Sequence, residues 1–199
     1  NRYAYLWYAM RSDMVTVHMQ IFAKKSLGQN FLHSKPTIEK IVAAGEVTNR
    51  DTVLEIGPGT GFLTEALLAK ADKVIAVEKD DRLIAPLKEK FAKEITEKRL
   101  VLVHEDGLNF NPEEVGLKSG KYKVVANIPY YITGEIIRQF LTSTHKPTSM
   151  TLLVQKEVAV RIARDKKESL LSLSEKAFGT PKYCFTVPRG AFRPAPNVD

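Results

Sequence analysis

The stretch Asn127-Ile128-Pro129-Tyr130 places an amide, a rigid imino acid and an aromatic ring next to one another. It follows the β-branched run 123–126, which predicts that a strand ends here and a loop begins. At a sheet edge, the amide oxygen and a backbone carbonyl accept hydrogen bonds while the tyrosine ring stacks, so the combination suits a flat ring that carries an amino group. The same residues also fit an ordinary strand exit, with Pro129 ending the strand and Tyr130 covering the core.

The second chemical feature is the glycine-rich turn 57–61, which follows a predicted buried strand over 52–56. Alternate glycines permit a tight turn and let a ligand lie against the backbone where the next helix begins. The spacing G-x-G-x-G lacks the third glycine of a dinucleotide fingerprint, because Phe62 stands there, and it lacks the Gly-Lys-Ser/Thr of a phosphate loop. Glu78 ends the next predicted strand about 20 residues later, where such folds bind ribose hydroxyls, although a solvated surface carboxylate is the alternative.

The elements that position these residues alternate between strand and helix. Strands are predicted over 52–56, 73–77, 100–103, 124–126 and 150–154, with a late strand over 183–187. Helices are predicted after the candidate caps Ser34 and Asp80 and over 62–69, 136–141 and 156–164. This alternation predicts an α/β fold in which right-handed crossovers build a mostly parallel sheet with helices on both faces.

Composition narrows the class of protein. The 199 residues are 44% hydrophobic and 27% charged, which predicts one globular α/β domain with or without tails. A net charge of +7 suits a polyanionic partner, nucleic acid first, although charge on its own favours a merely basic, solvated surface. Cys184 is the only cysteine, so an intrachain disulfide is excluded and a reducing compartment fits. The sequence contains no run of about 18 apolar residues, so no membrane span is predicted. The four histidines lack the spacing of metal ligands.

Glu55 followed by the G-x-G-x-G turn resembles motif I of S-adenosylmethionine-dependent methyltransferases. Four separated motifs in family order narrow the resemblance to the rRNA adenine N6-dimethyltransferases, and most to their small-subunit (KsgA) type. They occupy residues 28–32, 55–64, 127–130 and 154–158, and a fifth over 192–199 resembles F-x-P-x-P-x-V-D, so the match covers 24–199. Pro58 and the fifth motif favour this type over the erythromycin-resistance type, which modifies large-subunit rRNA and usually carries serine and lysine in motif I.

The resemblance implies a Rossmann-like methyltransferase fold with S-adenosylmethionine as cofactor and no metal. It implies N6,N6-dimethylation of adenosines in small-subunit (16S-type) rRNA during ribosome biogenesis. The enzyme would be a cytoplasmic monomer that binds rRNA or a precursor of the small ribosomal subunit and no membrane. Two alternatives stay open: a large-subunit rRNA adenine methyltransferase, and a ribosome-assembly or transcription accessory factor on the same fold.

The resemblance also assigns cofactor roles to individual residues. Asn30 and Leu32 would close over the cofactor, and five further positions would contact it: Gly57, Gly59, Glu78, Asp106 and Asn127. Asp106 matches the position that binds the adenine of the cofactor, and a helix cap or loop acid is its alternative. Phe31 fits closure over the cofactor and anchoring in the core equally well.

The target adenine is implied to bind at the Asn-Pro-Tyr corner. Asn127 and the Pro129 carbonyl would accept hydrogen bonds from its amino group, while Tyr130 would stack on one face of the base and Phe192 on the other. Candidate phosphate contacts are the basic residues Lys24, Lys25, Lys156, Arg161 and Arg164, each of which also fits a solvated surface charge.

Domain boundaries follow from the same match. Residues 24–199 are predicted to form the methyltransferase catalytic domain and residues 1–23 an N-terminal extension, with Met19 as the suggested natural start and a non-native segment before it. Family members continue beyond the position of Asp199 with a further strand and a small helical domain. That strand pairs with the preceding one and lies beside strand five, so its absence predicts that 183–187 lacks a neighbour and that a sheet edge is exposed.

Overall fold

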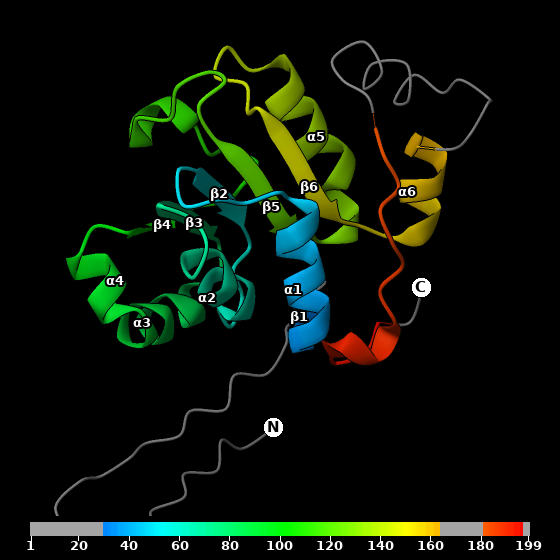
Figure 1. Cartoon of the computed structure of the whole chain (residues 1–199), viewed down its shortest axis with the longest axis horizontal. Helices are drawn as coiled ribbons and strands as arrows, with labels where there is room; N and C mark the ends of the chain where they lie inside the picture. The colour runs from blue at the N-terminus through cyan, green and yellow to red at the C-terminus, as the bar shows by residue number, and fades with distance from the viewer. Residues whose placement is uncertain (1–29, 164–180, 197–199) are drawn as a thin grey trace, which may run out of the picture.

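The computed structural model describes residues 30–163 and 181–196, and its centre is a parallel sheet in the order β4-β3-β2-β5-β6 (Figure 1). All four strand pairs are parallel, as expected where each strand returns to the same edge through a crossover. The strands are β2 (Thr52–Ile56), β3 (Lys73–Glu78), β4 (Leu100–His104), β5 (Lys123–Asn127) and β6 (Ser149–Leu153). The five corresponding predictions are confirmed to within one residue at each end.

Helices cover both faces of the sheet (Figure 1). They are α1 (Lys35–Ala44), α2 (Phe62–Leu68), α3 (Asp81–Lys90), α4 (Ala92–Thr96), α5 (Thr133–Thr142) and α6 (Lys156–Ala163). Asp80 caps α3 as predicted, because its Oδ1 accepts a hydrogen bond from the Arg82 amide at 3.2 Å. Ser34 stands at the N-cap of α1 but makes no capping hydrogen bond. Within the described ranges, no helix has the length and apolar composition that crossing a bilayer requires.

Two apolar clusters form on opposite sides of the sheet, because successive strand residues point to opposite faces. Val53, Val74 and Val125 belong to the cluster under α1, α2 and α3. Leu54 and Ile75 belong to the cluster that α5 closes. All five side chains are at most 1% exposed. Burial toward both faces explains why these strands are nearly continuous apolar runs in the sequence.

The late strand predicted over 183–187 is wrong as a strand. The segment is extended, and Tyr183, Phe185 and Val187 are half-buried while the residues between them are exposed. Phe185 and Val187 pack against the apolar cluster under α1. Among the described residues, however, β6 pairs with β5 alone and nothing pairs with this segment. The side-chain alternation of a strand is present, but the segment has no neighbour to supply the backbone hydrogen bonds that define one.

A short antiparallel ribbon, which the sequence does not predict, joins the two ends of the described chain. β1 (Phe31–Leu32) pairs with β7 (Phe192–Arg193), so that Leu32 lies opposite Phe192. The His33 amide extends the ribbon by donating to the Ala191 carbonyl at 2.9 Å. In Figure 1 the C-terminal segment runs past α6 and ends beside the start of α1. The first and last motifs of the sequence are therefore neighbours in space.

Candidate active site

The carboxyl ends of the parallel strands meet at one edge of the sheet, where folds of this class form ligand crevices. A cavity of about 1680 Å³ opens there and extends along β6. Its walls include the glycine turn after β2, Glu78 at the end of β3 and Asp106 after β4. Asn127 and Pro129, at the end of β5, line the same cavity. Residues that are far apart in the sequence thus share one space.

Three glycines shape the turn between β2 and α2. Gly57, Gly59 and Gly61 have φ angles of +72°, +59° and +79°, in the left-handed region that residues with a Cβ rarely adopt. Neighbouring rings also leave no room, because a Cβ on Gly59 would lie 3.0 Å from Phe31 Cδ1 and one on Gly61 would lie 2.6 Å from Phe91 Cε2. Phe31 lines the cavity and Phe91 packs behind the turn, so the turn is held from both sides.

Glu78 is buried, with 5% of its surface exposed, so the interpretation as a solvated surface carboxylate is wrong. Its Oε2 accepts a hydrogen bond from the Gly59 amide at 3.0 Å, and its Oε1 accepts one from the Asp80 amide at 2.8 Å. Burial raises the pKa of Glu78 above its usual value, against the effect of these amides. The carboxylate therefore ties the glycine turn to β3, and each oxygen keeps a lone pair for a ligand.

Asp106 begins the loop after β4 and is partly exposed. Its Oδ1 accepts a hydrogen bond from the Leu108 amide at 3.1 Å, and its Oδ2 forms an ion pair with Lys79 Nζ at 2.5 Å. Burial on its own would raise the pKa of Asp106, but the bond from Lys79 and the loop amide hold it below its usual value. The structure thus gives Asp106 the role of a loop acid while also placing it on the cavity wall, so its predicted contact with adenine stays a prediction.

Asn127 lies directly beside the glycine turn. A Cβ on Gly57 would be 3.8 Å from the Asn127 backbone oxygen. The Asn127 side chain donates a hydrogen bond from Nδ2 to the Asn30 carbonyl at 3.3 Å. This bond links the Asn-Pro-Tyr corner to the first motif and leaves Oδ1 as the acceptor atom of the amide.

The rest of the corner differs in part from the prediction. The Pro129 carbonyl accepts hydrogen bonds from the Ile132 amide at 3.2 Å and from Thr133 Oγ1 at 3.4 Å. These bonds form because Tyr130–Ile132 is a 3-10 turn leading into α5, and they compete with the predicted bond to adenine. The Tyr130 side chain lies outside the described part of the structure, so its stacking stays a prediction.

The ribbon supplies the other predicted aromatic and closing residues. Asn30, Phe31, Leu32 and Phe192 all line the cavity. Leu32 is buried at 6% exposure, and Phe31 and Phe192 are half-buried and pack against the cluster under α1. Phe31 packs against the core and also faces the glycine turn from the cavity, so core anchoring is confirmed and closure over the cofactor stays a prediction.

The predicted phosphate contacts are described only in part. Lys156 and Arg161 are exposed on α6, and Lys156 stands at the rim of the cavity. The remaining candidates, Lys24, Lys25 and Arg164, lie outside the described residues.

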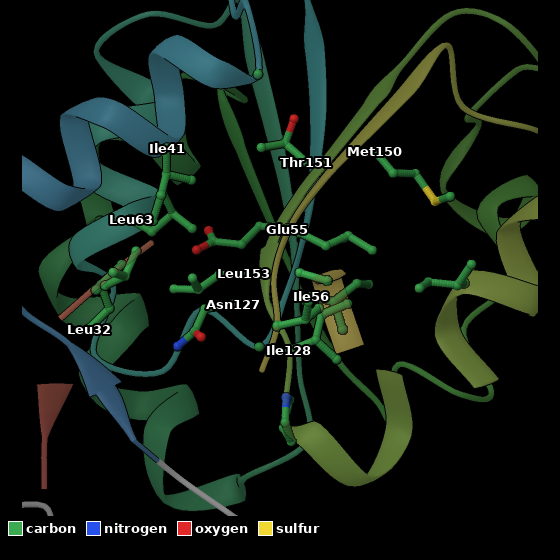
Figure 2. A pocket seen from close by; sticks show the side chains of 18 of the residues that line it. Leu32, Ile41, Glu55, Ile56, Leu63, Asn127, Ile128, Met150, Thr151 and Leu153 are labelled. Atoms are coloured by element: carbon green, nitrogen blue, oxygen red, sulfur yellow. The ribbon is translucent and has the colours of Figure 1, made fainter. Parts of the chain in front are cut away.

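Glu55 is the residue of the site that sequence reasoning undervalued. It is 1% exposed and points from β2 into the space near Leu63 and Leu153, on the same face of the sheet as Asn127 (Figure 2). Burial raises its pKa to about 8. The nearby Thr64 hydroxyl acts in the opposite direction and lowers the pKa of Glu55 in part. Neither Glu55 Oε2 nor Thr64 Oγ1, however, makes a hydrogen bond of normal geometry. The sequence signal that could have identified Glu55 is an acidic residue within the apolar run of β2.

This burial predicts a pH-dependent stability. The folded chain keeps the Glu55 proton between about pH 4.5 and pH 8, while the unfolded chain loses it near the lower value. Protons bound only by the folded state stabilise it at low pH, so the contribution is lost as the pH rises through that window. We expect the thermal midpoint of wild type to fall across the window more steeply than that of Glu55→Gln, which cannot ionise.

The matched control is Glu39→Gln, on the exposed face of α1. Its thermal midpoint should follow wild type at every pH measured. Parallel curves for wild type and Glu55→Gln would show that Glu55 is ionised in the folded chain at neutral pH.

Comparison with known proteins places the whole arrangement in context. The model of the family described as ribosomal RNA adenine dimethylase matches residues 21–199. The ribosomal RNA small subunit methyltransferase A of Dehalococcoides mccartyi is 50% identical over 178 residues, covering 89% of this chain and 60% of that protein. The protein of the same name from Mycoplasmopsis synoviae is 45% identical over 185 residues, covering 92% of this chain and 69% of that protein. The chain thus spans about 60% of the length of the first of these relatives.

Two solved structures are similar in fold. The 23S rRNA methyltransferase ErmE superposes with a TM-score of 0.74 and 30% identity, covering 85% of this chain and 66% of that one. A dimethyladenosine transferase from Plasmodium falciparum superposes with a TM-score of 0.72 and 31% identity, covering 84% of this chain and 60% of that one. The mostly parallel sheet and its flanking helices are therefore a Rossmann-like methyltransferase fold, as predicted.

Proposed function

The chain belongs to the ribosomal RNA adenine dimethylase family, and on this basis we propose that it transfers methyl groups from S-adenosylmethionine to N6 of adenosines in small-subunit rRNA. The observation that carries the proposal is the contact between the glycine turn and the Asn-Pro-Tyr corner, where Gly57 adjoins the Asn127 carbonyl. A donor on the turn and an acceptor base at the corner would be neighbours, as a direct transfer requires.

The residues at the strand ends fit the proposed cofactor. Gly57 and Gly59 present bare backbone to the cavity, and Glu78 and Asp106 offer carboxylate lone pairs to ribose and adenine. The buried Glu55 Oε2 lacks a hydrogen-bond partner in the described structure, which indicates a polar ligand nearby. Asn30 and Leu32 would close over the cofactor from the ribbon. When bound, S-adenosylmethionine supplies a methyl group already activated by the sulfonium charge.

The protein's task is then to position and activate the adenine amino group. That nitrogen is a poor nucleophile, because its lone pair is delocalised into the ring. An acceptor such as Asn127 Oδ1 would bind an amino hydrogen and favour a pyramidal, more nucleophilic nitrogen. The base must leave its helical stack to reach the cavity, as in other base-modifying enzymes. The basic chain, with Lys156 at the rim of the cavity and Arg161 exposed on α6, suits contacts to the RNA backbone.

Methylation assays with full-length protein and radiolabelled S-adenosylmethionine test the proposal. We expect label on two methyl groups per target adenine in purified small ribosomal subunits and none on free large-subunit rRNA. Label on large-subunit rRNA would instead support the large-subunit alternative, the activity that is named for ErmE. Binding to small subunits without any label would indicate an accessory role instead.

We also predict the effect of the aromatic residue at the corner. Tyr130→Ala is expected to abolish methyl transfer with the fold intact, because the target base loses its stacking surface. Tyr130→Phe keeps the ring and should retain most of the activity, which separates stacking from a role of the hydroxyl. Initial rates on small subunits measure both variants, and wild-type turnover by Tyr130→Ala would contradict the stacking role.

The remaining parts of the proposal concern the whole protein. The substrate is a precursor of the small subunit, and the enzyme acts in the cytoplasm. The enzyme is a monomer, and size-exclusion chromatography with light scattering measures this oligomeric state. Residues 24–199 form the catalytic domain, and 1–23 is an extension. A further strand adjoins the side of β6 that lacks a partner among the described residues, because an exposed edge strand invites pairing.

A further inference from the structure

Lys90, the last residue of α3, reaches across to the turn that precedes α2. Its Nζ donates a hydrogen bond to the Gly61 carbonyl at 3.3 Å and a long one to the Thr60 carbonyl at 3.5 Å. The same atom lies 4.8 Å from the centroid of the Phe62 ring and 3.0 Å from Glu65 Oε2. One ammonium group therefore contacts the last two residues of the turn and the first turn of α2.

These contacts act from behind the cavity. Thr60 and Phe62 line the cavity, whereas Lys90 does not. The Phe91 ring packs on the same rear side, where it leaves no space for a Cβ on Gly61. Lys90 and Phe91 are consecutive, so the end of α3 forms a support against which the glycine turn rests.

The turn needs such a support for an energetic reason. Its glycines have more conformational freedom than any other residue, so fixing them in one conformation costs conformational entropy. A ligand that binds a mobile turn must supply this ordering free energy itself, whereas a turn ordered in advance leaves the free energy for binding. Backbone bonds within the turn are few, and one of them runs from the Gly61 amide to the Pro58 carbonyl at 2.9 Å.

We propose that Lys90 is a positioning residue for the cofactor turn, because its ammonium group holds residues 60–62 in the conformation that presents the Gly57 and Gly59 backbone to S-adenosylmethionine. The inference rests on the proposed function for the identity of the ligand. A simple surface ion pair between Lys90 and Glu65 is the competing explanation. The Glu65 side chain is 65% exposed and that of Lys90 35%, and pairs in such positions contribute little.

Four variants of the full chain separate these explanations. Lys90→Met keeps the aliphatic stem and removes the ammonium, while Lys90→Arg keeps a cation with hydrogen-bond donors at the same position. Glu65→Gln removes the ion pair but leaves the contacts to residues 60–62. Lys88→Met removes an exposed charge from the same helix and serves as the matched control.

Calorimetry with S-adenosylhomocysteine and amide hydrogen exchange over residues 57–63 give the two readouts. We expect Lys90→Met to weaken binding about tenfold, the size of one charge-assisted hydrogen bond, and to speed exchange of the turn amides. Lys90→Arg should restore most of the affinity, and the two other variants should match wild type. In methylation assays, Lys90→Met should raise the KM for the cofactor while kcat at saturation is retained.

Three results would overturn the inference: unchanged binding and exchange in Lys90→Met, an equal loss in Glu65→Gln, or no rescue by arginine. A wild-type chain that fails to bind S-adenosylhomocysteine would instead overturn the proposed function and the cofactor role with it. Exchange distinguishes the two failures, because faster exchange in Lys90→Met still shows that Lys90 orders the turn.

Discussion

Asn127→Ala is expected to lower the rate of methyl transfer to small-subunit rRNA by about a hundredfold or more, the range seen when one preorganised polar group is removed from an active site. The Nδ2 bond to the Asn30 carbonyl holds the amide in one orientation, with Oδ1 left as the acceptor. An acceptor fixed in this way needs no reorganisation when the adenine amino group reacts. Alanine removes the acceptor and also releases the first motif from the corner.

The measurement is kcat with small subunits, together with the thermal midpoint of each variant. Asn127 is only partly buried, so we expect the midpoint of Asn127→Ala to stay close to wild type. Asn49→Ala, in the exposed turn before β2, is the matched control and should turn over normally. Wild-type turnover by Asn127→Ala would remove the central residue of the proposed mechanism.

Gly61→Ala is expected to lower both stability and cofactor binding, because two costs combine at one position. A residue with a Cβ at φ +79° costs about 1–2 kcal/mol in the left-handed region. The added Cβ would also lie 2.6 Å from Phe91 Cε2, and overpacking of this kind costs about 1–3 kcal/mol. We expect the free energy of unfolding to fall by both amounts and binding of S-adenosylhomocysteine to be lost.

Gly116→Ala separates the two costs. Gly116 has a φ of +74°, close to that of Gly61, but no atom lies within 4 Å of where its Cβ would be. Chemical denaturation of both variants should give a small loss for Gly116→Ala and a clearly larger one for Gly61→Ala. Equal losses would mean that Phe91 moves away without cost, and normal cofactor binding by Gly61→Ala would show that the turn is not the binding element.

The five strands of the sheet were predictable because each is a mostly apolar run that ends in, or is followed within two residues by, a glycine, acid or amide. The segment 183–187 carries an equally clear alternation, yet a strand also needs a partner backbone; its lack of a partner followed from the family resemblance and from no local pattern. The β1–β7 ribbon has two residues in each strand, too few for any periodicity to be detected.

The candidate site shows the same division. Motif positions located Glu78, Asp106 and Asn127 on one cavity, because the ends of parallel strands must converge. The partners of these residues were not predictable: Glu78 bonds backbone amides, Asp106 pairs with Lys79, and the Pro129 carbonyl is used by the following turn. Such bonds depend on the three-dimensional conformation of the loops, which local sequence patterns do not determine. The contact of Lys90 with the glycine turn was also not predictable, because no motif or spacing in the sequence points to Lys90.

The ribbon between β1 and β7 has a consequence for synthesis of the protein. Its two strands come from opposite ends of the described chain, so it is a contact of very high sequence separation and closes a long loop. The glycine turn and the sheet can assemble while translation is still under way, but the wall formed by Leu32 and Phe192 cannot close until the last motif has left the exit tunnel. A nascent chain would therefore hold an open cavity, and competence to retain a ligand would arise only after Phe192 has emerged and paired with Leu32.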